Sequence, residues 1–253
     1  DFKFCQFIKK GKTSFNYVYK MLKGLNKDLT RRKLLKEFML IFTKIIFLDK
    51  LDNYKRKKVE VHDGDMKKIR AKYINEVKDE TSTLRTIKTY IKYKKKLRKV
   101  HSKKPSLKIG IIGELYTAME PFSTYNLEDE LKKYGVSVKR FTNVSYLLIF
   151  KKILSPYVKY KTRDYLKYRQ GADASDNIYR ALYLKKKKYD GIIHTKPFGC
   201  TPEVGIIPIL NKISNEKQIP IMYLSFDTQT SSTGLKTRIE AFIDMLTMRK
   251  DKK

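Results

Sequence analysis

The stretch LKIGIIG, residues 107–113, decides the fold, because it is a short apolar run closed by glycine. Such a run is typical of a strand that is covered on both faces in a parallel sheet. Three later stretches have the same character: VSVKRF at 136–141, DGIIHT at 190–195 and IPIMYLSF at 219–226. The sequence therefore predicts four strands of one parallel sheet.

Helical patterns separate these strands. Asn126 is a candidate cap for a helix over 127–134, and Gly135 suits its end. Further helices are predicted over 144–160, up to or around Pro156, then over 173–188, over 202–213 with a kink at Pro208, and over 235–245. Alternating strands and helices predict an α/β fold with a doubly wound, mostly parallel sheet of the Rossmann or flavodoxin-like kind.

The chain before this region predicts helices. Thr30 can cap a helix whose apolar residues recur at three- and four-residue spacing through 34–48, which indicates an amphipathic helix. Residues 55–105 are very basic with a thin apolar stripe, and they end in a charge run that closes at Pro105. This pattern favours helices followed by a solvated linker.

We divide the chain into a helical, Lys-rich segment, 1–105, and an α/β domain, 106–253. The first residue is Asp1, and residues 1–10 lack the charged-then-apolar pattern of a signal peptide. We expect a mature protein or a piece of a longer one, with segment 1–105 as the remainder of, or linker from, a missing upstream domain.

The composition excludes several classes. With 253 residues and 41% hydrophobic content, the chain can bury a core. The most apolar run, 38–48, is interrupted by Thr43 and Lys44, which suits a buried helix and not a membrane span. The two cysteines, Cys5 and Cys200, form no CxxC and exclude a disulfide framework, and with only three histidines a zinc site is not expected. We expect a reducing, cytoplasmic compartment.

The formal charge of +32 has two interpretations. A nucleic-acid-binding protein would use it to hold a polyanion, and it would interleave basic and aromatic residues on one surface, as Tyr90, Tyr93 and the nearby lysines allow. Compositional bias explains the high net charge without any polyanion partner. Lys heavily outnumbers Arg, which is the bias that an AT-rich genome produces. We favour the second interpretation and keep the first as an alternative.

Three loops after the predicted strands carry unusual residues, at 113–122, 194–203 and 227–234. Ligands of open parallel sheets bind at the carboxyl ends of the strands. Cys200 lies just before a predicted helix start, where amide dipoles favour a thiolate, and Gly199 allows a bulky group to approach the backbone. A metal-binding or reactive thiolate and a small buried cysteine both remain open for Cys200.

Other residues near the strand ends are further candidates. Thr230 and Gly234 lie in a polar loop before a helix, where an anion could rest, although a capped surface loop fits as well. Arg238, one turn beyond, could pair with an anion or with groups beside Glu240. His194 ends a strand and either points into the site or is structural. No nucleophile triad or GxSxG is visible.

At these three loops the sequence resembles the 2-hydroxyacyl-CoA dehydratase component and activase-associated proteins of anaerobes, which are 2-hydroxyglutaryl-CoA dehydratase-like, in their C-terminal portion. The matching text is IGIIGELYTAMEPFSTYNLEDELKKYGVSV, then YDGIIHTKPFGCTPEVGIIPIL, then IPIMYLSFDTQTSSTGLKTRIEAFIDML. Order and spacing agree over most of residues 108–246, and the three segments together are specific.

The resemblance implies an iron–sulfur cluster, 4Fe–4S or double-cubane, and ATP-driven, low-potential electron transfer towards an acyl-CoA or another small substrate. It makes Cys200 a cluster ligand whose partner cysteines lie outside this chain, in an upstream α/β domain or a partner subunit. It further implies an ATP-dependent activator as a partner. With one matched cysteine, we expect this chain alone neither to hold a complete cluster nor to turn over substrate.

The same resemblance assigns tentative roles to other residues. Glu114 becomes a candidate acid/base group or a neighbour of the cluster, and Glu203 a candidate for orienting the Cys200 loop. Gly199, Thr230, Gly234 and Arg238 complete the expected cofactor-binding set, whereas Cys5 is taken as structural. The third alternative is a ligand-binding α/β module without a cluster, in which Cys200 would be buried and point away from the strand ends.

Overall fold

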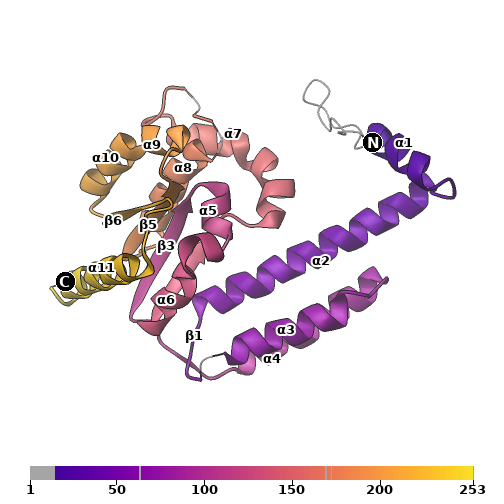
Figure 1. The fold of residues 1–253 in the computed structure, drawn as a ribbon, viewed down its shortest axis with the longest axis horizontal. Coiled ribbons are helices and arrows are strands. Elements are labelled where there is room, and N and C mark those ends of the chain that lie inside the picture. Colours follow the sequence, from indigo (N-terminus) through magenta and orange to yellow (C-terminus); the bar gives the residue numbers. More distant parts are fainter. Residues whose placement is uncertain (1–14, 63, 169, 172, 253) are drawn as a thin grey trace.

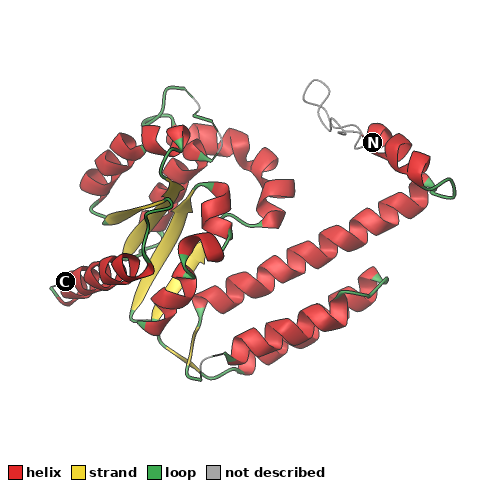
Figure 2. Cartoon of the chain, in the orientation of Figure 1, coloured by secondary structure: helices red, strands yellow, loops and turns green. Residues whose placement is uncertain are grey.

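The computed structural model describes residues 15–62, 64–168, 170–171 and 173–252. The helices are α1 (Phe15–Leu25), α2 (Arg31–Lys57), α3 (Asp65–Val77), α4 (Thr83–Lys99), α5 (Leu115–Met119), α6 (Leu127–Lys133), α7 (Lys151–Thr162), α8 (Ala174–Lys186), α9 (Thr201–Gly205), α10 (Ile207–Lys217) and α11 (Ser232–Asp251), with a 3-10 turn, η1 (Phe122–Thr124), and a π-helical turn, η2 (Tyr146–Phe150). The strands are β1 (Val59–Glu60), β2 (Ser102–Lys103), β3 (Leu107–Gly113), β4 (Val136–Arg140), β5 (Gly191–Pro197) and β6 (Ile221–Phe226). Figures 1 and 2 show the larger sheet wrapped by helices, with the long helix α2 and the pair α3–α4 beside it.

The four strands expected from the apolar runs form one all-parallel sheet in the order β4-β3-β5-β6. In the register of β3 with β5, Gly113 lies opposite Thr195. The backbone of Gly113 has φ +139°, and a Cβ there would overlap the carbonyl oxygen of Thr195, so only glycine fits this close approach. The strands β1 and β2 form a separate antiparallel pair that the sequence did not indicate.

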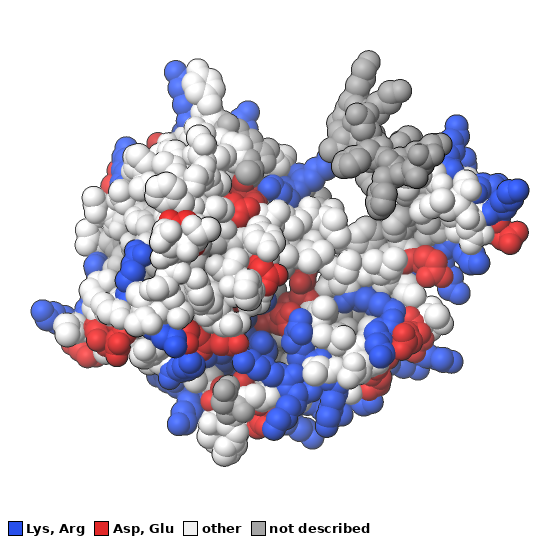
Figure 3. All heavy atoms as spheres, in the orientation of Figure 1, with Lys and Arg blue, Asp and Glu red and all other residues white. Residues whose placement is uncertain are grey.

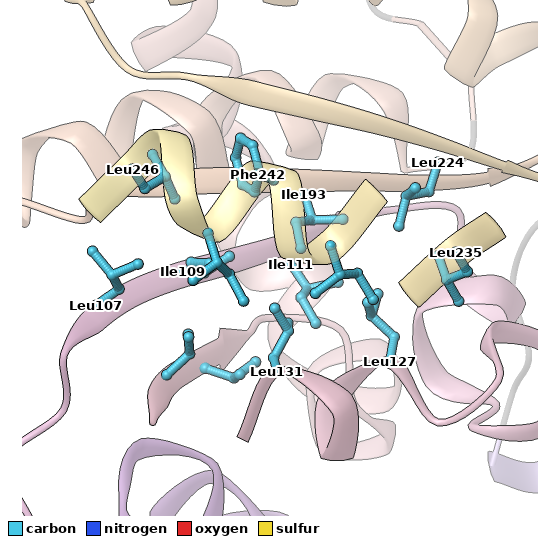
Figure 4. Packing of buried hydrophobic residues seen from close by; sticks show 14 of the residues in the cluster. Leu107, Ile109, Ile111, Leu127, Leu131, Ile193, Leu224, Leu235, Phe242 and Leu246 are labelled. Carbon is cyan, nitrogen blue, oxygen red and sulfur yellow. The ribbon is translucent and has the colours of Figure 1, made fainter. Parts of the chain in front are cut away.

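Helices cover both faces of the four-stranded sheet, which confirms the doubly wound α/β class. On one face, α6 and α11 pack on the strands through an apolar cluster, part of which is shown in Figure 4. On the other face, α8 and α10 bury a second cluster that includes Ile178, Leu184 and Leu210. Because β3 and β5 are buried from both sides, their sequences are nearly continuous apolar runs.

The helical segment packs against the edge of this sheet. The hydroxyl of Ser137 in β4 donates a hydrogen bond to the carbonyl of Lys57 at the end of α2, at 3.0 Å. Further back along α2, the carboxylate of Asp49 accepts one from the backbone N–H of Ser145 at 2.7 Å. The helices α2, α3 and α4 share their own apolar cluster. The predicted cap of α2 is confirmed, because the side chain of Thr30 accepts a hydrogen bond from the N–H of Lys33.

Two local expectations were wrong. The helix expected over 202–213 is two helices, α9 and α10, which break at Ile206. Pro208 lies in the first turn of α10, where a proline needs no N–H partner, so it begins a helix and does not kink one. Asn126 does precede α6, but its backbone is left-handed (φ 56°) and its side chain makes no capping hydrogen bond.

The described helices include none that is both long and apolar enough to cross a membrane.

Candidate functional site

The candidate site lies where the direction of chain connection reverses within the sheet. From β3 the chain continues to β4 on one side, and from β5 it continues to β6 on the other. In open α/β sheets, the crevice outside the carboxyl ends of two such strands is the usual ligand position. The loops that follow β3 and β5 at this point carry Glu114 and Cys200.

Cys200 is a free, partly exposed thiol in the residue before α9. Its carbonyl accepts a hydrogen bond from the N–H of Val204, at 2.9 Å, and its own N–H donates to the carbonyl of Pro197, at 3.3 Å. The N–H of Phe198 donates to the carbonyl of Phe226, which ties the loop to β6. Gly199 is exposed, and a Cβ placed there would meet no atom within 4 Å. The loop is thus fixed by its backbone and leaves open space beside Gly199, the residue before Cys200.

A buried polar network holds the other side of this loop. Glu203, 1% exposed, has one carboxylate oxygen 2.7 Å from His194 Nε2. The amide Nδ2 of Asn177 donates to both carboxylate oxygens of Glu203, at 2.9 and 3.0 Å. A buried carboxylate is stable only with such partners. The prediction that Glu203 orients the Cys200 loop remains untested, and its contacts fit that role.

Asn177 also makes two hydrogen bonds to the end of β3. Its Oδ1 accepts a hydrogen bond from the N–H of Gly113 at 3.2 Å, and its Nδ2 donates to the carbonyl of Gly113 at 3.0 Å. Arg180 donates to Asn177 Oδ1 and to the hydroxyl of Thr142. Sequence reasoning missed Asn177 and Arg180, because polar residues of a helix are ordinarily expected to face solvent. The available signal was an Asn and an Arg three residues apart, which places them on the same face of the helix.

A second buried group borders the network. Burial raises the pKa of Asp176 above its usual range, although Arg180 and Lys151 act in the opposite direction. Lys151 pairs with Asp173 at 2.7 Å and lies 3.9 Å from Asp176. These contacts connect the first turn of α8 to the first turn of α7, and so brace the helix that carries Asn177.

His194 and Glu114 have structural partners. The ring of His194 is fully buried among α9 and β6 residues, with an edge contact to Tyr223, and its Nδ1 has no partner in the part of the chain that the structure describes. The carboxylate of Glu114 caps α5 by accepting hydrogen bonds from the N–H groups of Tyr116 and Thr117 and from the hydroxyl of Thr117. A catalytic role for Glu114 stays a prediction.

The remaining candidates lie around β6 and α11. The hydroxyl of Thr230 bonds to Asp227 within its own loop, and its carbonyl accepts from the hydroxyl of Tyr125. The N–H of Gly234 donates to Ser231, which caps α11. Arg238 donates to the carbonyl of Tyr223 on the outer strand β6, at 2.6 Å. The structure therefore places Arg238 beside the edge strand β6, and its role in binding a cofactor stays a prediction.

The described residues do not include a complete ligand set for an iron–sulfur cluster. Across residues 15–62, 64–168, 170–171 and 173–252, no three His, Cys, Asp or Glu side chains come together in a way that could hold a metal. Cys200 is the cysteine of this part of the chain, and Cys5 lies outside the described residues. A four-iron cluster takes four thiolates, so further ligands would have to join Cys200.

The basic residues are unevenly spread. Residues 1–105 hold 32 of the 58 Lys and Arg but 11 of the 26 Asp and Glu. Figure 3 shows many Lys and Arg over α3 and α4, with acidic residues among them. However, Tyr90 and Tyr93 are buried, at 9% and 4% exposure, in the cluster between α2, α3 and α4. These rings cannot stack on bases, so the aromatic–basic surface that nucleic-acid binding predicts is not formed by them.

The fold and loop geometry define a doubly wound α/β protein with a thiol at its switch point. Residues 165–246 match the model of the family 2-hydroxyglutaryl-CoA dehydratase, D-component. The matched segment runs from the end of α7 to α11 and includes Asn177, His194, Cys200 and Glu203. The match confirms the resemblance for this C-terminal region, which is 2-hydroxyacyl-CoA dehydratase component-like. No curated protein matches the chain.

Proposed function

We propose that this chain is an iron–sulfur redox component of a 2-hydroxyacyl-CoA dehydratase-like system, and that Cys200 supplies one thiolate to its cluster. The observation that carries the proposal is the position of Cys200. It is a partly exposed thiol at the carboxyl end of β5, at the switch point, inside the segment that matches the dehydratase component.

The loop is suited to holding a thiolate in place. A metal ligand must be oriented by the groups around it, and these outer contacts fix its geometry. Here the backbone bonds of Phe198 and Val204 fix the loop from two sides, and Glu203 anchors α9 to β5 through His194. A ligand-binding module without a cluster would be supported by a buried Cys200 that points away from the strand ends, whereas this thiol is partly exposed.

The proposal requires further components that the described residues do not provide. The remaining thiolates come from an upstream α/β domain or a partner subunit, an ATP-dependent activator supplies electrons, and an acyl-CoA is the substrate class. When bound, the cluster would supply low-potential electron transfer. The described residues would contribute the single ligand and its rigid support. Thiols of this kind are kept reduced in the cytoplasm, which is the compartment we propose.

The test compares wild type with Cys200→Ser. The protein is isolated anaerobically with the chains that co-purify, reconstituted with iron and sulfide, and analysed for iron content and visible absorbance. Cys5→Ser is the matched control, because it removes the other thiol of the chain. We expect Cys200→Ser to lose iron and absorbance while Cys5→Ser retains both. Equal iron in wild type and Cys200→Ser, or none in either, would remove the cluster role of Cys200.

A further inference from the structure

A second candidate site lies between the helical segment and the carboxyl ends of β3 and β4. It is a cavity of about 330 Å³, at the lower end of the volumes typical of small-ligand sites. Its lining comes from α2, α3, α5, α6 and the strand ends, and it does not include Cys200. The basic side chains that line it are Lys55, Arg56, Arg70 and Arg140.

The acidic residues of the lining do not neutralise these groups. Arg56 and Arg140 share one carboxylate, that of Glu128, at 2.8 and 2.9 Å. Asp52 pairs with Arg70. The third acidic residue, Asp129, pairs with Lys67, which is not part of the lining. The ammonium group of Lys55 contacts no carboxylate among the described residues. Positive charge is therefore in excess in the cavity.

Arg140 gives the strongest indication that this cavity binds a ligand. It is only 9% exposed, and its NH1 donates to the carbonyl of Ala118 and pairs with Glu128. Its Nε is buried and has no hydrogen-bond partner within the described part of the chain. A buried guanidinium donor without an acceptor costs free energy, which a bound oxyanion would recover.

Two neighbouring lysines have lowered pKa values, mainly because they are partly buried, with repulsion from nearby basic groups as a further cause. Burial lowers the pKa of Lys139 to about 8, and repulsion by Lys57 and Arg56 adds to this effect. Burial also lowers the pKa of Lys132, with repulsion from Lys55 as the next cause. Glu60, Asp129 and Glu128 act in the opposite direction on Lys132, and its pKa is still lowered.

We propose that this cavity binds a small oxyanion, a phosphate or carboxylate group, with Arg140 and Lys55 as its principal donors. Guanidinium groups match the geometry of such anions, and the low polarity around Arg140 strengthens the contact. The volume leaves room for a compact organic body attached to the anionic group. This proposal does not depend on the cluster role of Cys200, because Cys200 does not line the cavity.

The experiment is isothermal titration calorimetry on the full chain at fixed ionic strength, with inorganic phosphate and acetate as separate probes. The variants are Arg140→Gln and Lys55→Gln. The control is Arg85→Gln, which removes one charge from an exposed position on α4 that lies outside the cavity. Circular dichroism checks that each variant is folded. We expect saturable binding of at least one probe, with affinity reduced about tenfold or more by Arg140→Gln and severalfold by Lys55→Gln.

Arg85→Gln should bind like wild type. The probe that binds more tightly identifies the anionic group. No saturable binding of either probe would overturn the proposal, and so would an equal loss in Arg85→Gln, which would reveal a response to net charge alone. If Arg140→Gln does not fold, Lys55→Gln tests the proposal. Removing the ammonium group of Lys55 leaves no carboxylate unpaired, so this variant is expected to fold. Unchanged affinity in a folded Lys55→Gln would then overturn the proposal.

Discussion

The carboxylate of Glu203 lies 2.7 Å from the Nε2 atom of His194, and both side chains are buried. His194 belongs to β5, and Glu203 follows Cys200 by three residues in the next helix. The pair therefore joins the strand to the helix that follows it, across the loop that carries Cys200. Asn177 joins the pair to the end of β3.

Replacing Glu203 by alanine should destabilise the fold. The change leaves His194 Nε2 buried without its partner, and Asn177 Nδ2 keeps only its hydrogen bond to the carbonyl of Gly113. A buried polar group without a partner costs about 1–3 kcal/mol. We expect the free energy of unfolding, measured by urea denaturation, to fall by about 2–4 kcal/mol. Glu240→Ala is the control, because Glu240 is exposed on α11, and it should change stability by less than about 0.5 kcal/mol. Equal effects of the two substitutions would contradict the structural role of Glu203.

Replacing Gly113 by alanine should separate β3 from β5. The added Cβ would overlap the carbonyl of Thr195, which accepts a hydrogen bond from the N–H of Glu114, and φ +139° strains any residue with a side chain. We expect a loss of about 3 kcal/mol or more, read as a lower thermal midpoint. Gly24→Ala in α1 is the control, because no atom lies within 4 Å of its added Cβ, and it should be neutral or slightly stabilising. A wild-type midpoint for Gly113→Ala would show that the strands adjust.

Much of the fold could be predicted because buried strands must be apolar. The runs that contain Ile111, Val138, Ile193 and Leu224 have no other stable placement than a covered sheet, and each became a strand. The strands β1 and β2 were not predicted, because two residues are too few to show the alternation of apolar and polar residues that indicates a strand. They form only because the ends of α2 and α4 come close to one another.

The position of the site could be predicted from the sequence, but the residues that hold its loops in place could not. Cys200 stands out because of its place between a strand and a helix, and the structure confirms that place. The contacts of Asn177 with Gly113, 64 residues away, follow from no local pattern. The same holds for the oxyanion cavity, where Arg56 meets Glu128 across 72 residues. Such pairs exist only once the sheet and helices have packed.

The half-buried amine of Lys139 predicts a stability that depends on pH. Its pKa is about 8 in the folded protein and near the usual 10.5 in the unfolded chain. Between these values the unfolded chain holds a proton that the folded protein has lost, so the free energy of unfolding should rise as pH increases from about 8 to 10.5. Below pH 8 this contribution is constant and unfavourable. Urea denaturation across this window measures the slope.

Lys139→Met should reduce this slope and stabilise the protein at pH 7, because it eliminates the cost of burying this charge, while Lys132 still contributes to the slope. Lys36→Met is the control, since Lys36 is exposed on α2, and it should leave the slope as in wild type. An unchanged slope in Lys139→Met would assign the pH dependence to other groups.

The shared carboxylate of Glu128 predicts the largest electrostatic effect. Glu128→Gln removes the ion-pair partner that the nearly buried guanidinium groups of Arg56 and Arg140 share. Because an uncompensated buried charge is strongly destabilising, we expect a loss of about 2–4 kcal/mol in urea denaturation. Glu130→Gln, in the same helix, breaks a pair with the exposed Lys133 and should cost less than about 1 kcal/mol. If the cavity binds an oxyanion, phosphate should restore more stability to Glu128→Gln than it adds to Glu130→Gln, because the anion replaces the missing charge. Equal gains in both variants would show that phosphate acts only as a general stabilising salt.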